Sequence, residues 1–196
     1  MSPAGKLDAA RTALVVVDVQ EGFRKAIPDF ERIARATATL VEGAEAIGVP
    51  VAITEQYPKG LGKTASEVAE RLPKGTEPIA KVCFSAAEAE GFDLGGRDQA
   101  LVCGLETHVC VNQTVLDLLA SGTEVHVAED AVGSRFDENK QVGLQKMERA
   151  GAVLTSVETA LFELLGRAGT DEFKRVQKLI LEYAPNPGAE AKETLA

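Results

Sequence analysis

Short apolar runs alternate with longer segments of helical periodicity along most of the chain. The runs are rich in valine and other apolar residues, which is typical of strands buried on both faces. The segments between them repeat apolar positions every three to four residues, as amphipathic helices do. We therefore expect strands at Thr12–Val17, Val49–Thr54, Pro78–Phe84, Gln99–Cys103, Glu124–Ala128 and Ala152–Thr155. We expect helices from the capping residue Asp29 to Gly48, and at about Ser66–Leu72, Glu106–Ala120, Glu138–Ala150, Glu158–Leu165 and Asp171–Tyr183.

This order of elements predicts an α/β fold, a three-layer α/β/α sandwich around a six-stranded, mostly parallel sheet. The chain has no internal repeat, no low-complexity tract and no long linker. Residues 1–196 are therefore expected to form a single domain, with a core at about 12–185 and short tails. The last residues, PNPGAEAKETLA, are expected to fray.

Composition narrows the class of protein. The 196 residues are 45% hydrophobic with a formal net charge of −9, and no basic cluster is present, which disfavours nucleic acid and anionic membranes as partners. The apolar run at Ala13–Val17 is too short for a signal peptide or a membrane span. Three cysteines are too few for a disulfide scaffold, so we expect reduced thiols in a cytoplasmic protein.

Three reactive side chains follow predicted strands. Asp18 comes after the first strand, Lys81 lies at the end of the third, and Cys110 lies in the first turn of the helix after the fourth. Because parallel strands bring their carboxyl ends to one edge of the sheet, these side chains are expected to meet there. The helix N-terminus and the Lys81 ammonium would favour the Cys110 thiolate and attract an anionic substrate. Asp18 would exchange the thiol proton, and backbone N–H groups between Gly104 and Cys110 would bind an oxyanion.

Each of these residues also has a purely structural interpretation. An aspartate after a strand is often a helix cap, a lone lysine is usually a solvated charge, and a cysteine in an apolar helix is usually a small core residue. Their joint placement favours the chemical interpretation. Cys103, inside a strand, is expected to pack in the core. Cys83 lies two residues past Lys81 and is expected on the same face of that strand, either near the site or filling the core.

Metal and nucleotide chemistry have little support. His108 and His126 are the only histidines, and with the cysteines they form no zinc-binding spacing. His126 alternates within a strand and is expected to pack there. His108 and Cys110 point to different sides of a helix, which excludes a dyad. The turn after the first strand has one glycine where a dinucleotide fingerprint needs three. We expect no cofactor and no metal.

Three segments, LVVVDVQEGF, IAKVCFS and LVCGLETHVCVNQT, resemble the isochorismatase-like cysteine hydrolase superfamily in sequence and order. The resemblance runs from about Thr12 to Pro185, and the segments TEQYPKGLGKT, SGTEVHVAEDAVGSR and FKRVQKLI are most similar to the small isochorismatase-domain-containing proteins. The resemblance implies a Rossmann-like parallel sheet and a catalytic triad.

By position, the resemblance makes Asp18 the general base, Lys81 its charge partner and Cys110 the nucleophile. It also implies a non-proline cis peptide at Leu105–Glu106 and an oxyanion hole formed by the backbone N–H groups of Glu106 and Cys110. The substrate pocket would include Gln20, Phe23 and Tyr57. Members of the superfamily form homo-oligomers, dimers or tetramers, and we expect the same here.

Two departures bear on the substrate. Nicotinamidase relatives have a metal-binding Asp-x-His-xxx-His motif, whereas EQYPKGLGKTASEV here contains no histidine. Isochorismatases of siderophore pathways replace the nucleophilic cysteine, whereas Cys110 is present. We therefore expect hydrolysis of a small amide, ureide or related acyl compound through a thioester on Cys110. The alternatives are a thiol redox sensor or interaction protein on the same scaffold, or a catalytically silent member.

Overall fold

The structure, a computed structural model, describes residues 5–183 of the chain. The expectations for the C-terminal tail and for the end of the core near residue 185 concern residues outside this range. The single domain expected for residues 1–196 therefore stays a prediction.

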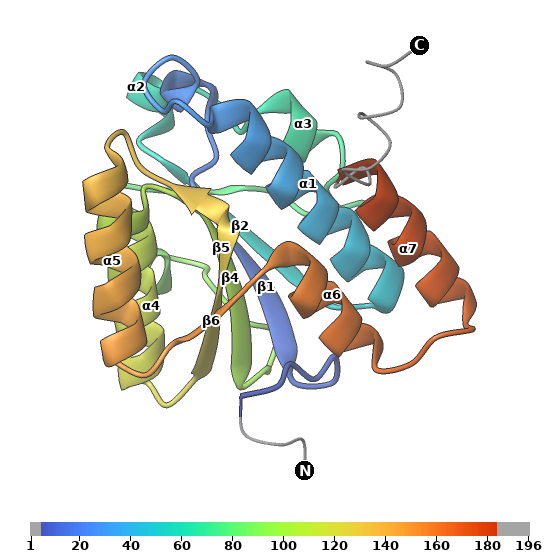
Figure 1. Cartoon of the computed structure of the whole chain (residues 1–196). Coiled ribbons are helices and arrows are strands. Elements are labelled where there is room, and N and C mark those ends of the chain that lie inside the picture. Colours follow the sequence, from blue (N-terminus) through green and yellow to red (C-terminus); the bar gives the residue numbers. More distant parts are fainter. Residues whose placement is uncertain (1–4, 184–196) are drawn as a thin grey trace, which may run out of the picture.

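Six parallel strands form one sheet within the described residues, in the order β3-β2-β1-β4-β5-β6 (Figure 1). The strands are β1 (Thr12–Val17), β2 (Val51–Gln56), β3 (Ile79–Lys81), β4 (Gln99–Leu105), β5 (Glu124–Gly133) and β6 (Val153–Thr155). The predicted α/β sandwich is confirmed, and every pairing in the sheet is parallel. Strand order reverses between the central strands β1 and β4, which is where open α/β sheets bind their ligands.

Helices cover both faces of the sheet. On one face lie α1 (Phe30–Ile47), α3 (Ser66–Ala69), α6 (Val157–Leu165) and α7 (Asp171–Tyr183), and on the other lie α4 (Asn112–Ala120) and α5 (Asp137–Arg149) (Figure 1). Short turns complete the fold: α2 (Pro58–Leu61), the 3₁₀ turns η1 (Glu21–Phe23) and η2 (Ala86–Glu88), and the π-helical turn η3 (Thr107–Val111). No helix in residues 5–183 is both long and apolar enough to span a membrane.

The two faces of β1 build two separate cores. Leu14 and Val16 pack with the apolar stripes of α1, α6 and α7, whereas Val15 and Val17 pack with α4 and α5. All six residues of β1 are buried, which explains why its sequence is a continuous apolar run. Burial on both faces holds this strand and its carboxyl end in a fixed place.

The structure differs from the predicted elements mainly at their ends. β3 stops at Lys81, so Cys83 lies beyond the strand, and the alternation argument that placed it on the face of Lys81 is wrong. The Asp29 side chain does not cap α1 and instead pairs with Arg32 at 3.2 Å. β5 continues five residues past the predicted end at Ala128, beyond a register shift against β4 between Val102 and Gly104. These ends depend on neighbouring strands, which a local pattern does not contain.

Candidate active site

Asp18 lies directly after β1 and is completely buried. Its backbone has φ 52°, a left-handed conformation that is uncommon for a residue with a side chain and recurs at functional sites. The Thr54 hydroxyl donates a hydrogen bond to Oδ1 at 2.7 Å, and the Lys81 ammonium lies 2.7 Å from Oδ2. Both carboxylate oxygens are thus held by side chains from other strands, Thr54 of the adjacent β2 and Lys81 of β3, the strand beyond it.

Lys81 is sealed inside the protein. Its side chain has no exposed surface, and Nζ lies within hydrogen-bond distance of four oxygens: Asp18 Oδ2 at 2.7 Å, Gln56 Oε1 at 2.7 Å, Phe84 O at 2.9 Å and Cys83 O at 3.3 Å. An ammonium has three N–H groups, so its donors are all used. The expectation that Lys81 attracts an anionic substrate is therefore wrong, because its ammonium is buried and paired with Asp18.

Cys110 lies in the π-helical turn η3, at the carboxyl end of β4, and is 5% exposed. Its carbonyl accepts a hydrogen bond from the Thr114 hydroxyl at 2.7 Å, and that hydroxyl oxygen accepts one from the N–H of Ala86 at 2.8 Å. The turn is therefore tied both to α4 and to the segment that follows Lys81.

Burial raises the pKa of the Cys110 thiol to about 12. Burial is the largest contribution to this increase in pKa. Asp18, through its charge and a hydrogen bond with the thiol, and the Glu106 charge also contribute to it, whereas Lys81 opposes it. The expected thiolate is therefore not the resting form, because desolvation outweighs the lysine. At neutral pH Cys110 is therefore a thiol, next to the side chain of Asp18.

Two glycines allow the site elements to approach one another. A Cβ atom on Gly104, which has φ 120°, would lie 1.9 Å from the Val17 carbonyl oxygen, so only glycine lets β4 pass β1 here. A Cβ on Gly143 of α5 would lie 3.0 Å from the backbone of His108. The first glycine lets β4 approach β1, and the second lets α5 approach the turn that carries Cys110.

Glu106 connects the turn to β5. The peptide bond Leu105–Glu106 is cis, as the resemblance implied, and the Glu106 carbonyl accepts hydrogen bonds from the N–H groups of Val109 and Val111. The buried Glu106 carboxylate accepts two hydrogen bonds through Oε2, from the N–H of Arg135 at 2.9 Å and from Arg135 Nε at 3.1 Å. The site thus has a second charged pair, close to Cys110.

The predicted pocket residues differ in environment. Gln20 is completely buried and forms hydrogen bonds with the backbone of Gln56 and of Gly62, so it supports β2 and has little left for a substrate. Phe23 is half-buried and packs against the α1-side core. Tyr57 is 54% exposed, and its N–H donates to the Lys81 carbonyl at 2.8 Å, which joins its backbone to the end of β3.

Sequence reasoning missed Thr54 and Gln56, the polar residues that hold Asp18 and Lys81. A signal for them exists, because both are polar residues in the last three positions of β2, the strand next to β1. They were not selected as candidates because neither a threonine nor a glutamine is charged or strongly nucleophilic at neutral pH.

The side chains of the remaining cysteines and histidines have environments of their own. Cys103 is buried in β4, as predicted, and burial raises its pKa to about 12. The half-buried Cys83 thiol donates to the Ser85 carbonyl at 3.4 Å. His126 is buried in β5, as predicted, 3.2 Å from Glu124, and His108 lies 3.0 Å from the Ser134 hydroxyl. In residues 5–183 no group of three or more possible ligands could hold a metal ion.

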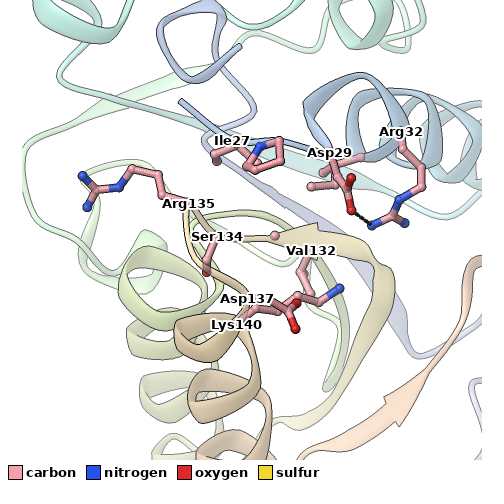
Figure 2. Close-up of a pocket in the computed structure, with 11 residues that line it drawn as sticks. Ile27, Asp29, Arg32, Val132, Ser134, Arg135, Asp137 and Lys140 are labelled. Carbon is pink, nitrogen blue, oxygen red and sulfur yellow. Dashed lines mark hydrogen bonds and ion pairs between the residues drawn. The ribbon is translucent and has the colours of Figure 1, made fainter. Parts of the chain in front are cut away.

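A cavity of about 100 Å³ lies next to the site, between the first turns of α1 and α5 (Figure 2). Figure 2 shows Asp29, Arg32 and Lys140 around it, with Asp29 and Arg32 paired, whereas the Arg135 guanidinium points away. Burial and the nearby Arg32 charge lower the pKa of Lys140. None of the triad residues lines this cavity.

Comparisons with known proteins agree with this architecture. A family model described as the isochorismatase domain matches residues 12–159. Human isochorismatase domain-containing protein 2 is 40% identical over 187 residues, covering 94% of this chain and 90% of that protein. The structure of MAR1 ribonuclease from Caenorhabditis elegans is similar with a TM-score of 0.85 and 38% identity, covering 93% of this chain and 96% of that chain. The YcaC protein of Escherichia coli, an octameric hydrolase of unknown specificity, has a TM-score of 0.86 at 24% identity with complete coverage of both chains, and this likeness shows the fold alone.

Proposed function

The chain belongs to the isochorismatase family, and from this premise we propose that it is a cysteine hydrolase of small amides, ureides or related acyl compounds. Cys110 is the nucleophile, Asp18 the general base and acid, and Lys81 the fixed charge partner of Asp18. The observation that carries the proposal is a thiol, 5% exposed, whose hydrogen-bonding neighbour is a carboxylate locked by Lys81 at 2.7 Å.

The first step couples attack to proton transfer. With a pKa of about 12, releasing the Cys110 proton to water at pH 7 would cost about 7 kcal/mol. Asp18 avoids a free thiolate by taking the proton as sulfur bonds to the acyl carbon. The backbone N–H groups of Glu106 and Cys110 bind the resulting oxyanion.

The second half of the reaction restores the enzyme. The C–N bond breaks, the leaving amine takes the proton from Asp18, and a thioester remains on Cys110. Water then attacks the thioester, gives a proton to Asp18, and the tetrahedral intermediate collapses to the acid. The departing sulfur recovers its proton from Asp18, so the sum is amide plus water giving acid plus amine.

Lys81 acts by position, because its donors are saturated. Its ammonium keeps one oxygen of Asp18 in place between attacks, while Thr54 fixes the other oxygen at 2.7 Å. A buried pair of this kind has little freedom to reorganise during proton transfer, which keeps the proton acceptor in place.

The experiment is a substrate panel of amides, ureides and esters, with intact-protein mass measured during turnover. The wild type is expected to release amine and to carry an acyl group on Cys110. Cys110→Ala is expected to lose both signals. Cys103→Ala, which removes a buried thiol on the opposite face of the sheet, is the matched control and is expected to keep both. Turnover that survives in Cys110→Ala would overturn the proposal.

A thiol redox sensor is the alternative function. A sensor cysteine reacts as a thiolate and needs access to peroxide, whereas Cys110 is buried with a raised pKa. This environment favours the hydrolase. Mass mapping after peroxide treatment tests the alternative, and rapid, reversible oxidation of Cys110 without any turnover would support the sensor.

RNA belongs in the panel because one similar protein is a ribonuclease. The net charge of −9 disfavours a polyanionic substrate here, so no cleavage of RNA is expected. Cleavage that depends on Cys110 and rises as salt is lowered would contradict this expectation.

The assembly is expected to be a homo-oligomer. Val82 and Phe84, next to Lys81 in the chain, are 79% and 51% exposed, and Phe136 at the start of α5 is 61% exposed. Exposed apolar side chains of this size favour contact with another protein surface. Light scattering measures the mass in solution, and a monomer at micromolar concentration would contradict the expectation.

A further inference from the structure

The Glu106–Arg135 pair joins the turn of the nucleophile to the loop after β5. Glu106 immediately precedes η3, is 6% exposed, and its charge acts on the Cys110 thiol. Arg135 follows β5, the strand next to β4, so both residues lie at the carboxyl edge of the sheet. Glu106 is therefore a neighbour of the Cys110 sulfur, and Arg135 is bound to that neighbour.

Glu106 binds the Arg135 guanidinium through Nε and, among the described residues, leaves its two terminal nitrogens unbound. Its Oε2 accepts from the backbone N–H and from Nε of Arg135, at 2.9 and 3.1 Å. Within residues 5–183 the two terminal nitrogens of Arg135 form no hydrogen bond with the protein, and the side chain is 53% exposed. Figure 2 shows the guanidinium extending away from the cavity between α1 and α5.

A guanidinium fixed at Nε presents its terminal N–H groups as a planar fork. This fork matches the two oxygens of a carboxylate and forms parallel hydrogen bonds with them. Because Glu106 has already ordered the side chain, binding a second carboxylate costs less conformational entropy than ordering a free arginine. The arrangement is a preorganised receptor for a carboxylate.

The other cation of the site cannot take this role. Lys81 is completely buried and surrounded by four oxygens. In a chain of net charge −9, an anionic substrate needs a local positive group that is accessible, and Arg135 meets both conditions.

We propose that Arg135 binds a carboxylate of the substrate, so that the preferred substrates are short acyl compounds with an anionic group near the scissile carbonyl. The inference rests on the proposed function, because it assigns the substrate class of the same site. Arg135 then determines specificity, and Glu106 is the positioning residue that orients it.

The test compares two alkylating reagents that differ in charge, neutral iodoacetamide and anionic iodoacetate. Their rates at Cys110 are measured by peptide mass in the wild type, Arg135→Gln and Arg149→Gln. Arg149 is exposed at the far end of α5, so its variant removes the same charge away from the site. The ratio of the iodoacetate rate to the iodoacetamide rate is expected to fall about tenfold in Arg135→Gln and to stay constant in Arg149→Gln. Arg135→Lys, which keeps the charge and loses the fork, is expected to recover part of the ratio.

This readout needs no turnover, so it separates the two proposals. An unchanged ratio in a folded Arg135→Gln protein overturns the carboxylate site even if amides are hydrolysed. A ratio that depends on Arg135 supports the site even if no thioester forms. When turnover is found, succinamate and its neutral methyl ester provide the second comparison. Arg135→Gln is expected to raise KM about tenfold for succinamate alone, with kcat nearly unchanged, and equal changes for both compounds would contradict the inference.

Discussion

The two sides of the candidate site differ in how completely their polar groups are satisfied. On the fixed side, formed by Asp18, Thr54, Gln56 and Lys81 from β1 to β3, charged groups are buried and hydrogen-bonded to one another. On the turn side, formed by Glu106, Cys110 and Arg135, a thiol lies beside the carboxylate of the fixed side and a guanidinium reaches solvent.

This difference suggests that the fixed side serves proton transfer and the turn side serves substrate selection. Saturated groups on the fixed side can hold and move a proton but have no donors left for a substrate. The turn side has the proposed nucleophile and the accessible donors, so we expect substrate choice to come from there. Members of one family can then keep the first side and vary the second.

The largest effect is expected from breaking the fixed side with Asp18→Asn. Turnover should fall about 1,000-fold because the proton acceptor is lost. The free energy of unfolding should fall by about 3–5 kcal/mol because Lys81 is left buried without a counter-charge. Steady-state kinetics and urea unfolding measure the two effects.

The matched control is Asp171→Asn, which breaks an exposed Asp–Lys pair on α7. Its cost should stay below about 1 kcal/mol because solvent screens that pair. Equal losses in the two variants would mean that the buried pair contributes no more than a surface pair.

A smaller effect is expected from forcing the two sides apart with Gly104→Ala. The new Cβ would lie 1.9 Å from the Val17 carbonyl oxygen, so β1 and β4 must shift beside Asp18. We expect a loss of about 3 kcal/mol or more in stability. Gly122→Ala has a similar positive φ with nothing within 4 Å of the Cβ, and should cost about 1 kcal/mol. Denaturant unfolding of both variants separates the clash from the backbone conformation.

The remaining effect concerns the buried thiols, and it is small at neutral pH and grows above pH 9. The pKa values of Cys103 and Cys110 are raised to about 12 from an ordinary value of 9.0, so the folded state keeps these protons more tightly than the unfolded state. Stability from each thiol is therefore complete below about pH 9 and is lost as the pH rises toward 12, by about 1.4 kcal/mol per pH unit. Urea unfolding at pH 8.5, 9.5 and 10.5 measures this slope.

Single variants show how much each thiol contributes to the pH dependence of the free energy of unfolding. Cys103→Ala and Cys110→Ala should each remove the contribution of one thiol to this slope. Asp18→Asn should reduce only the share of Cys110, because the Asp18 charge helps to raise that pKa and is no cause of the shift at Cys103. An Asp18→Asn protein whose slope matches the wild type would contradict the coupling between the two sides.

The strand that positions Asp18 was predictable because its signal is local. A run of buried valines defines β1 at both ends, and α7 was predicted at its observed bounds, Asp171–Tyr183, from its apolar spacing. The short β3 was predicted too long, since its length is set by pairing with β2 over three residues only. The error carried over to Cys83, whose position was argued from alternation in a strand that had already ended.

The meeting of the three candidate side chains was predictable from the sequence, but their electrostatics was not. A rule on parallel sheets was enough to select Asp18, Lys81 and Cys110, because all three follow strands in the sequence. The same rule could not tell that Lys81 would be sealed by four oxygens, or that burial would keep Cys110 protonated. Those outcomes depend on Gln56, Phe84 and other groups that are distant along the chain.

The sequence by itself determined the order of elements, the parallel sheet and the candidate reactive side chains, because hydrophobic periodicity and residue type are local properties. Only the tertiary structure decided which charged side chains are buried and paired and which are exposed to a substrate. The solvation of a charge depends on every atom packed around it, whatever its position in the chain. This is why Lys81 proved closed to substrate, and why Arg135, which is ordered by Glu106 and remains exposed, became the candidate for substrate recognition.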